Sequence, residues 1–197
     1  MSVSMYKDFL KCPACALAKL KGEWVPENNT ALLVGSFFHS HFDGSMDKFK
    51  MENPSIFTKQ GELKAEYKLA NKMINTLETD KFCMYMLRGE SEVIMTTELF
   101  GVKWKCKLDK IDYENERFAD IKSTKNFERI WNSERKEKVT FVEEYGYDIQ
   151  LAVYREIISK YLNKENRFDG FIVAATKETV PDKMIISIDP DTLDNAL

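Results

Sequence analysis

Apolar and charged residues alternate strictly between residues 102 and 109. The apolar residues are Val102, Trp104, Cys106 and Leu108. The charged residues that alternate with them are Lys103, Lys105, Lys107 and Asp109. A period of two places successive side chains on opposite faces of a β-strand. Residues 117–123 are predicted to form a partner strand after a polar turn, and the β-branched residues within 92–100 predict a strand before both. We therefore expect a three-stranded meander.

Helical spacing of apolar residues marks most of the remaining chain. It predicts helices over residues 5–20, 31–49, 61–87 and 145–163. The first is expected to break at Pro13, and a second short helix is expected after Thr79 within the third range. Two further strands are expected at residues 168–175 and 184–188, and a short terminal helix from Pro190. The charged stretch 123–144 is expected to be a loop around a short helix.

The order of these elements limits the fold class. Helices come first, then a meander, then one long helix and two strands, which predicts an α+β (or α/β) fold with a small mixed β-sheet flanked by helices. Nothing along the chain indicates a boundary, so we expect a single domain over residues 1–197.

Composition narrows the class of protein. Hydrophobic residues make up 44% and charged residues 31%, as in a globular protein, and the net charge is only −3. Any nucleic-acid site must therefore be a local basic patch. No apolar run of 18 residues is present, and the first eight residues lack the pattern of a secretory signal, so we expect a cytoplasmic location and no membrane contact.

Four cysteines are present, and disulfides are not expected in that compartment. Cys12 and Cys15 have the spacing of half a zinc site, but no second pair follows. Two semi-buried thiols at a helix end are the favoured interpretation.

The candidate chemistry lies on the meander. Asp120 and Lys122 share a face of their strand, and Asp109 on the neighbouring strand can reach the same point. Two carboxylates and a backbone carbonyl suit Mg²⁺ or Mn²⁺, which prefer hard oxygen ligands. A lysine beside them can orient a water molecule and stabilise charge on a phosphate under attack. An Asp-x-Lys tripeptide alone is more typical of an ordinary charged hairpin than of an active site.

Two further motifs change that balance. Gly35 and His39 lie four residues apart in a predicted helix upstream, and Gln150 and Tyr154 lie four apart on one face of the long helix downstream. The ordered set resembles the PD-(D/E)xK nucleases, in particular the RecB-like and phage exonuclease branch that includes RecE and the lambda exonuclease. The resemblance covers roughly residues 2–175 and implies a restriction-endonuclease-like core.

The resemblance also implies roles for individual residues. The metal ligands would be Asp109, Asp120, the Ile121 carbonyl and, either as a ligand or in support of one, His39. Lys122 would be the catalytic lysine. Gln150 and Tyr154 would steady the active site and the DNA backbone. Glu98 is a candidate for a second metal, in competition with Glu90 and Glu92, and His41 matches no motif.

The chain departs from the family pattern in two places. Leu108 precedes Asp109 in place of the proline of the family motif, a departure that this branch commonly tolerates. Some relatives hold an iron–sulfur cluster through one early and three late cysteines, but no cysteine follows Cys106, so we expect no such cluster.

Basic residues offer contacts to DNA phosphates. Lys103, Lys105 and Lys107 share the face of Asp109, which predicts a basic rail leading to the carboxylates. The loop after the second acidic strand is also rich in lysine and arginine, although interleaved glutamates fit a solvated charged surface as well. Trp131 in that loop could stack on a base or could anchor the loop.

The function predicted from these motifs is a Mg²⁺- or Mn²⁺-dependent exonuclease acting on double-stranded DNA ends. The resemblance implies 5′→3′ polarity, a homo-oligomeric ring, a single-strand annealing protein as partner, and a role in phage-type recombination or repair in a bacterial or phage-infected cell. The alternatives are a nuclease-like module that binds DNA without cutting it, and an endonuclease or single-strand exonuclease on the same fold.

Overall fold

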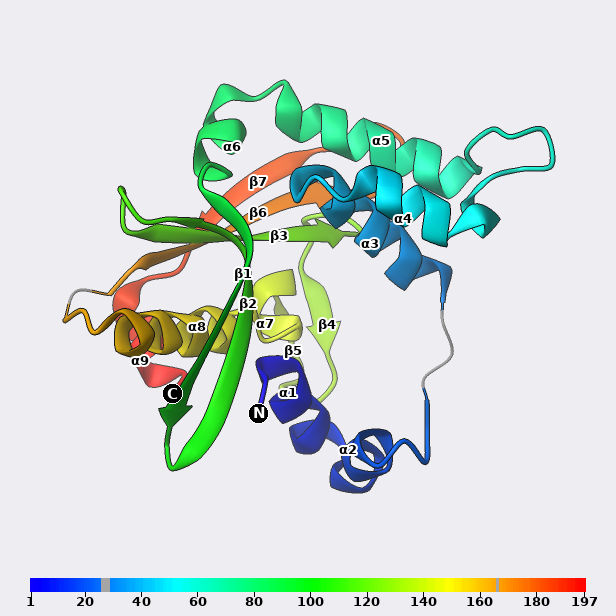
Figure 1. The fold of residues 1–197 in the computed structure, drawn as a ribbon. Coiled ribbons are helices and arrows are strands. Elements are labelled where there is room, and N and C mark those ends of the chain that lie inside the picture. Colours follow the sequence, from blue (N-terminus) through cyan, green and yellow to red (C-terminus); the bar gives the residue numbers. More distant parts are fainter. Residues whose placement is uncertain (26–28, 166) are drawn as a thin grey trace.

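The computed structural model describes residues 1–25, 29–165 and 167–197. Its main feature is a five-stranded mixed sheet in the order β1-β2-β3-β6-β7 (Figure 1). The strands are β1 (Glu90–Leu99), β2 (Val102–Asp112), β3 (Arg117–Thr124), β6 (Asp169–Thr176) and β7 (Lys183–Ser187). The first three form the predicted antiparallel meander, β6 runs parallel to β3, and β7 pairs antiparallel with β6.

Helices cover both faces of this sheet. On one face lie α3 (Thr30–Phe42), α4 (Met46–Glu52), a 3₁₀ turn at Pro54–Ile56, α5 (Ala65–Glu78) and α6 (Lys81–Met86) (Figure 1). On the other face lie α8 (Tyr147–Leu162), which connects β3 to the parallel β6, and α9 (Pro190–Asn195). The α+β prediction with a helix-flanked mixed sheet is confirmed.

Alternate residues of β3 enter two different apolar cores. Phe118 packs with α8 residues such as Leu151, whereas Ala119 and Ile121 pack with α3 residues such as Phe37. Because side chains alternate along a strand, Asp120 follows Phe118 onto the α8 side. The long amphipathic helix α8 therefore lies on the side of the sheet to which Asp120 points.

The N-terminal helices α1 (Val3–Lys11) and α2 (Pro13–Leu20) form a pair beside α8. Pro13 occupies the first turn of α2, where its missing N–H costs no hydrogen bond. The backbone N–H of Cys15 donates to Cys12 Sγ at 3.3 Å, where α1 ends and α2 begins. Cys12 is half-buried as expected, whereas Cys15 is exposed because it lies on the outer side of the first turn of α2.

Two details differ from the sequence prediction. The stretch 31–49 is two helices, because Gly44 adopts φ +80° between α3 and α4 and ends the first helix. The expected loop at 123–144 contains a hairpin of β4 (Ile130–Asn132) and β5 (Glu137–Val139) before the short helix α7 (Phe141–Glu144). Among the described residues, no helix is both long enough and apolar enough to span a bilayer.

Candidate active site

The pairing between the neighbouring strands β2 and β3 ends just before Asp109 is reached. Their last paired residues are Lys110 and Ala119, although the same register would set Asp109 opposite Asp120. Instead, the Asp109 carboxylate lies in the gap and its Oδ2 accepts a hydrogen bond from the backbone N–H of Ile121 at 2.7 Å. Since the N–H and C=O of one strand residue point to the same side, the Ile121 carbonyl faces this gap as well.

His39 approaches Asp109 from α3. Its Nδ1 lies 3.5 Å from Asp109 Oδ2. Burial alone would raise the pKa of Asp109, but His39 and Lys122 outweigh it and hold this pKa below its ordinary value. Burial lowers the pKa of His39, and Asp109 more than offsets that effect, so the net pKa is raised. His39, from the Gly35–His39 motif, thus lies beside Asp109, the candidate metal ligand on β2.

Asp120 is only 4% exposed, and other site residues surround it. Gln150 Nε2 donates to its Oδ1 at 2.6 Å, and Lys122 Nζ lies 2.6 Å from its Oδ2. Burial, with a smaller contribution from the charge of Asp109, raises the pKa of Asp120. Burial lowers the pKa of Lys122, but the two aspartates outweigh burial and raise it overall, so the lysine stays charged.

Helix α8 supplies the wall behind these groups. It begins after Gly146, whose φ of +59° turns the chain into the helix. Tyr154 packs at 6.4 Å against the ring of Phe118, and burial raises its pKa. The Lys122 ammonium lies 4.9 Å from the ring centre of Tyr147. Tyr147 is absent from the sequence prediction, although its place three residues before Gln150 on the same helix face was a usable signal.

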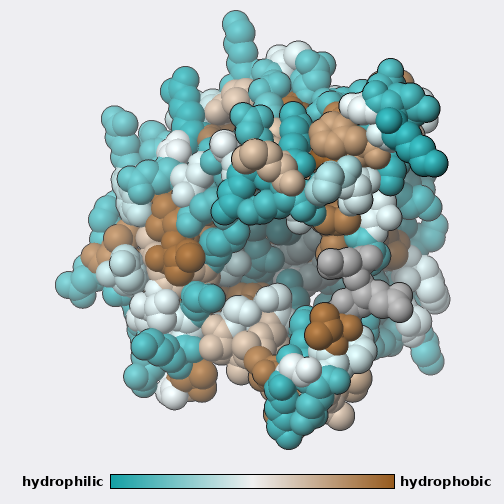
Figure 2. Space-filling view, turned by 45° about the vertical axis from the view of Figure 1, so that its right-hand side comes forward, coloured by the Kyte–Doolittle hydropathy of each residue, from teal (hydrophilic) through white to brown (hydrophobic). Residues whose placement is uncertain are grey.

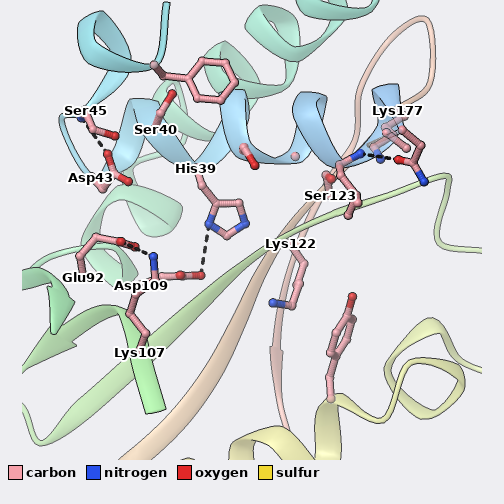
Figure 3. Close-up of a pocket in the computed structure, with 17 residues that line it drawn as sticks. His39, Ser40, Asp43, Ser45, Glu92, Lys107, Asp109, Lys122, Ser123 and Lys177 are labelled. Carbon is pink, nitrogen blue, oxygen red and sulfur yellow. Dashed lines mark hydrogen bonds and ion pairs between the residues drawn. The ribbon is translucent and has the colours of Figure 1, made fainter. Parts of the chain in front are cut away.

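A cleft of about 750 Å³ opens over the site. Its lining includes Gly35, His39, Asp109 and Lys122 (Figure 3), and Figure 2 shows a hollow on this side of the molecule. Of the three glutamates considered for a second metal, Glu92 lines this cleft. Glu98 instead lies at the far end of β1, paired with Lys103.

The other predicted DNA contacts are spread more widely. Lys107 lines the cleft and forms an ion pair with Glu92, and Lys105 lines an adjoining groove. Lys103 lies further along β2, where its carbonyl accepts a hydrogen bond from the N-terminal amine at 2.6 Å. Trp131 is 60% exposed on β4, opposite Lys138 and apart from the carboxylates. The three lysines follow one strand as predicted, but only two of them reach the grooves.

The comparisons with known proteins agree with this geometry. A family model described as "PDDEXK-like domain of unknown function (DUF3799)" matches residues 2–197. This chain belongs to that PDDEXK-like family. The predicted resemblance is confirmed, and the mixed sheet with its flanking helices is the restriction-endonuclease-like fold that it implied.

Solved structures extend the finding. A crystal structure from Eubacterium rectale, described as that of a "Putative exonuclease", has 42% sequence identity and a TM-score of 0.92, covering 100% of this chain and 75% of that chain. A second structure, of SSO0001, has 15% identity and a TM-score of 0.33 over 90% of this chain and 78% of that chain, too weak a likeness to carry an argument. No curated protein matches. Family and fold together support a nuclease function.

The PDDEXK-like site offers a donor set that fits a divalent metal. Across the described ranges no three His, Cys, Asp or Glu side chains form a ready-made cluster for an ion. Mg²⁺ does not require one, because it is commonly held by one or two carboxylates together with waters and substrate phosphate. Burial and the neighbouring charge of Asp109 both disfavour the ionised form of Asp120, although the Lys122 ammonium lies beside its Oδ2. A hard cation between the two carboxylates would relieve both effects.

Proposed function

We propose that this protein is a divalent-metal-dependent deoxyribonuclease that removes nucleotides from the ends of duplex DNA. The observation that carries the proposal is the break between β2 and β3, where Asp109 and Asp120 flank one gap and Lys122 contacts Asp120. Asp109, Asp120 and the Ile121 carbonyl would hold Mg²⁺ or Mn²⁺, and His39 would join them or orient Asp109. When bound, the ion supplies Lewis-acid activation of the attacking water and of the phosphate.

The protein's own groups hold this arrangement in place. Gln150 fixes one oxygen of Asp120, and the Lys122 ammonium stays beside the other. From that position Lys122 can donate a hydrogen bond to the attacking water or to a phosphate oxygen that gains negative charge. Because the ammonium is already oriented and largely shielded from solvent, its attraction for that charge is stronger than in bulk water.

The finer features of the function rest on weaker support. The Eubacterium rectale structure carries the word exonuclease in its description, which supports cutting from an end. The motif set supports 5′→3′ polarity, a homo-oligomeric ring, a single-strand annealing partner and a role in recombination or repair. Lys105 and Lys107 would contact DNA phosphates, and Trp131 would meet a base only where the substrate extends beyond the cleft.

The test compares linear duplex DNA labelled at either the 5′ or the 3′ end with closed circular DNA, all with Mg²⁺. Wild type should release mononucleotides from the 5′ label first and leave the circle intact. Lys122→Ala should cut at least about a hundredfold more slowly, the usual loss when one preorganised charge-stabilising group is removed. Asp47→Asn, at an exposed acid of α4, is the matched control and should cut normally.

Each other outcome points to a different function. Cleavage of the circle would replace the exonuclease with an endonuclease. Tight binding with no product under any divalent metal would favour a module that holds DNA without cutting it. Full activity in Lys122→Ala would remove that lysine from the mechanism.

A further inference from the structure

Two lysines that no motif predicts line the grooves beside the catalytic groups. The first, Lys177, directly follows β6, and its backbone N–H donates to Thr124 O at 2.8 Å. Its side chain lines the 750 Å³ cleft together with Ser36 and Ser123. Figure 3 shows Lys177 and Ser123 at one end of this cleft, with Glu92 and Lys107 at the opposite end.

The ammonium of Lys177 is half-buried, and no nearby anion in the described part of the chain offsets the free-energy cost of removing it from water. The ion pairs of the described residues include none for it, and burial alone lowers its pKa. Removing an ammonium from water costs free energy unless an anion or hydrogen-bond acceptors replace the water. A phosphate in the cleft would meet that requirement.

The second lysine, Lys7, belongs to α1 and lines an adjoining groove of about 560 Å³. Its Nζ donates to Tyr145 O at 2.8 Å and lies 5.3 Å from the ring centre of Tyr147. Burial, with the charge of Lys122 next in size, lowers its pKa to about 8. No carboxylate of the described chain forms an ion pair with it. The groove also exposes Gln150 and Lys105, so a phosphate there would meet several donors.

The two grooves meet at the catalytic centre. Lys107 and Tyr147 line both of them. Tyr147 lies near both Lys7 and Lys122. Asp109 lines the cleft, and Gln150, which donates to Asp120, lines the groove. A strand that passed from the α3 side to the α1 side would therefore run past the catalytic groups.

We propose that Lys177 and Lys7 bind the backbone phosphates on the two sides of the scissile phosphate, so that the cleaved strand runs from the cleft beneath α3 to the groove beneath α1. This inference rests on the proposed nuclease function and adds the path of the strand. Both lysines are positioning residues, because they act on phosphates that do not react.

The experiment uses Lys7→Gln and Lys177→Gln, with Lys72→Gln on the exposed face of α5 as the control. Binding of a fluorescent oligonucleotide is measured by anisotropy without metal over a range of salt concentrations. Each site variant should bind about tenfold more weakly, the effect of losing one charge-assisted hydrogen bond. The slope of log K against log salt should also fall by about 0.7 to 0.9, as one phosphate contact is lost. The control should change neither quantity.

A second measurement locates the phosphates. Methylphosphonates, which carry no charge, replace one phosphate at a time in the substrate, and cleavage rates are compared. Wild type should slow at one position on each side of the scissile bond. The cleavage rate of Lys7→Gln should not change further when the methylphosphonate is at one of these positions, and that of Lys177→Gln should not change further when it is at the other. Lys7→Arg and Lys177→Arg should restore binding, because arginine keeps the positive charge. If the glutamine variants do not fold, Lys7→Met and Lys177→Met replace them, because methionine keeps the apolar stem of the lysine.

The outcomes separate the two proposals. Wild-type cleavage together with site variants that behave like Lys72→Gln overturns the strand path and leaves the nuclease intact. The path is likewise overturned if both variants keep the wild-type sensitivity to every methylphosphonate. Wild type that neither binds nor cuts DNA under any condition overturns the proposed function, and the path falls with it.

Discussion

A nearly buried carboxylate such as Asp120 is costly to retain, and its surroundings show what it is retained for. Gln150 donates a hydrogen bond to one of its oxygens and the Lys122 ammonium lies beside the other, yet burial and the charge of Asp109 still raise its pKa. A core residue would normally be apolar or fully hydrogen-bonded. A buried acid beside a second acid, with its pKa raised, is typical of a functional site, and a cation between the two acids would stabilise both.

Gly35 gives a prediction at the same scale. It lies in the middle of α3, where glycine costs about 1 kcal/mol relative to alanine, and an added Cβ would meet no atom within 4 Å. Gly35→Ala should therefore raise the free energy of unfolding by about 1 kcal/mol in urea denaturation. It should also slow DNA cleavage, because the new methyl group projects into the cleft that Gly35 lines.

The matched control is Asn71→Ala on the exposed face of α5, which gains helix propensity away from the cleft. It should stabilise the protein and leave cleavage unchanged. Equal cleavage rates for Gly35→Ala and wild type would show that the substrate does not approach α3 at this residue.

At the scale of elements, the meander forms the site because β2 is held in place beyond Asp109 and then separates from β3 at Asp109. Gly89 lies just before β1 with φ +108°, and a Cβ there would lie 2.0 Å from the carbonyl oxygen of Ile111 in β2. The backbones of two elements therefore touch at a point where only glycine fits. This contact anchors the meander at the end of β2 that follows Asp109.

Gly89→Ala should lower the free energy of unfolding by more than about 2 kcal/mol, since it combines a clash with backbone with a left-handed φ. Gly101→Ala is the control, because φ there is +72° but an added Cβ meets nothing within 4 Å. It should cost only about 1 kcal/mol. Urea denaturation of both variants measures the difference, and equal losses would contradict the close contact.

The pattern of side chains predicted the elements where they are long and amphipathic, as in β2 and α8. It failed between residues 123 and 144, because the three-residue strands β4 and β5 are too short to show a period. It also joined α3 to α4, since one glycine turn leaves the apolar rhythm on both sides intact.

At the scale of the whole molecule, the site lies where two layers and two cores meet. Helix α3 brings His39 from one face of the sheet and α8 brings Gln150 from the other, and both reach the gap between β2 and β3. Local motifs predicted these residues because each has a recognisable spacing. Lys7 and Lys177 were not predictable, since only folding brings positions 170 residues apart to adjoining grooves.

The most direct test of the central claim is the binding of Mn²⁺, followed by electron paramagnetic resonance, to wild type and to Asp109→Asn, Asp120→Asn and Asp47→Asn. This measurement needs no knowledge of the substrate. If the two carboxylates of β2 and β3 hold one divalent ion, wild type and Asp47→Asn should bind Mn²⁺ alike, and each site variant should bind it at least about tenfold more weakly, a loss of about 1.4 kcal/mol. Folded Asp109→Asn and Asp120→Asn proteins that bind Mn²⁺ as tightly as wild type would contradict the account.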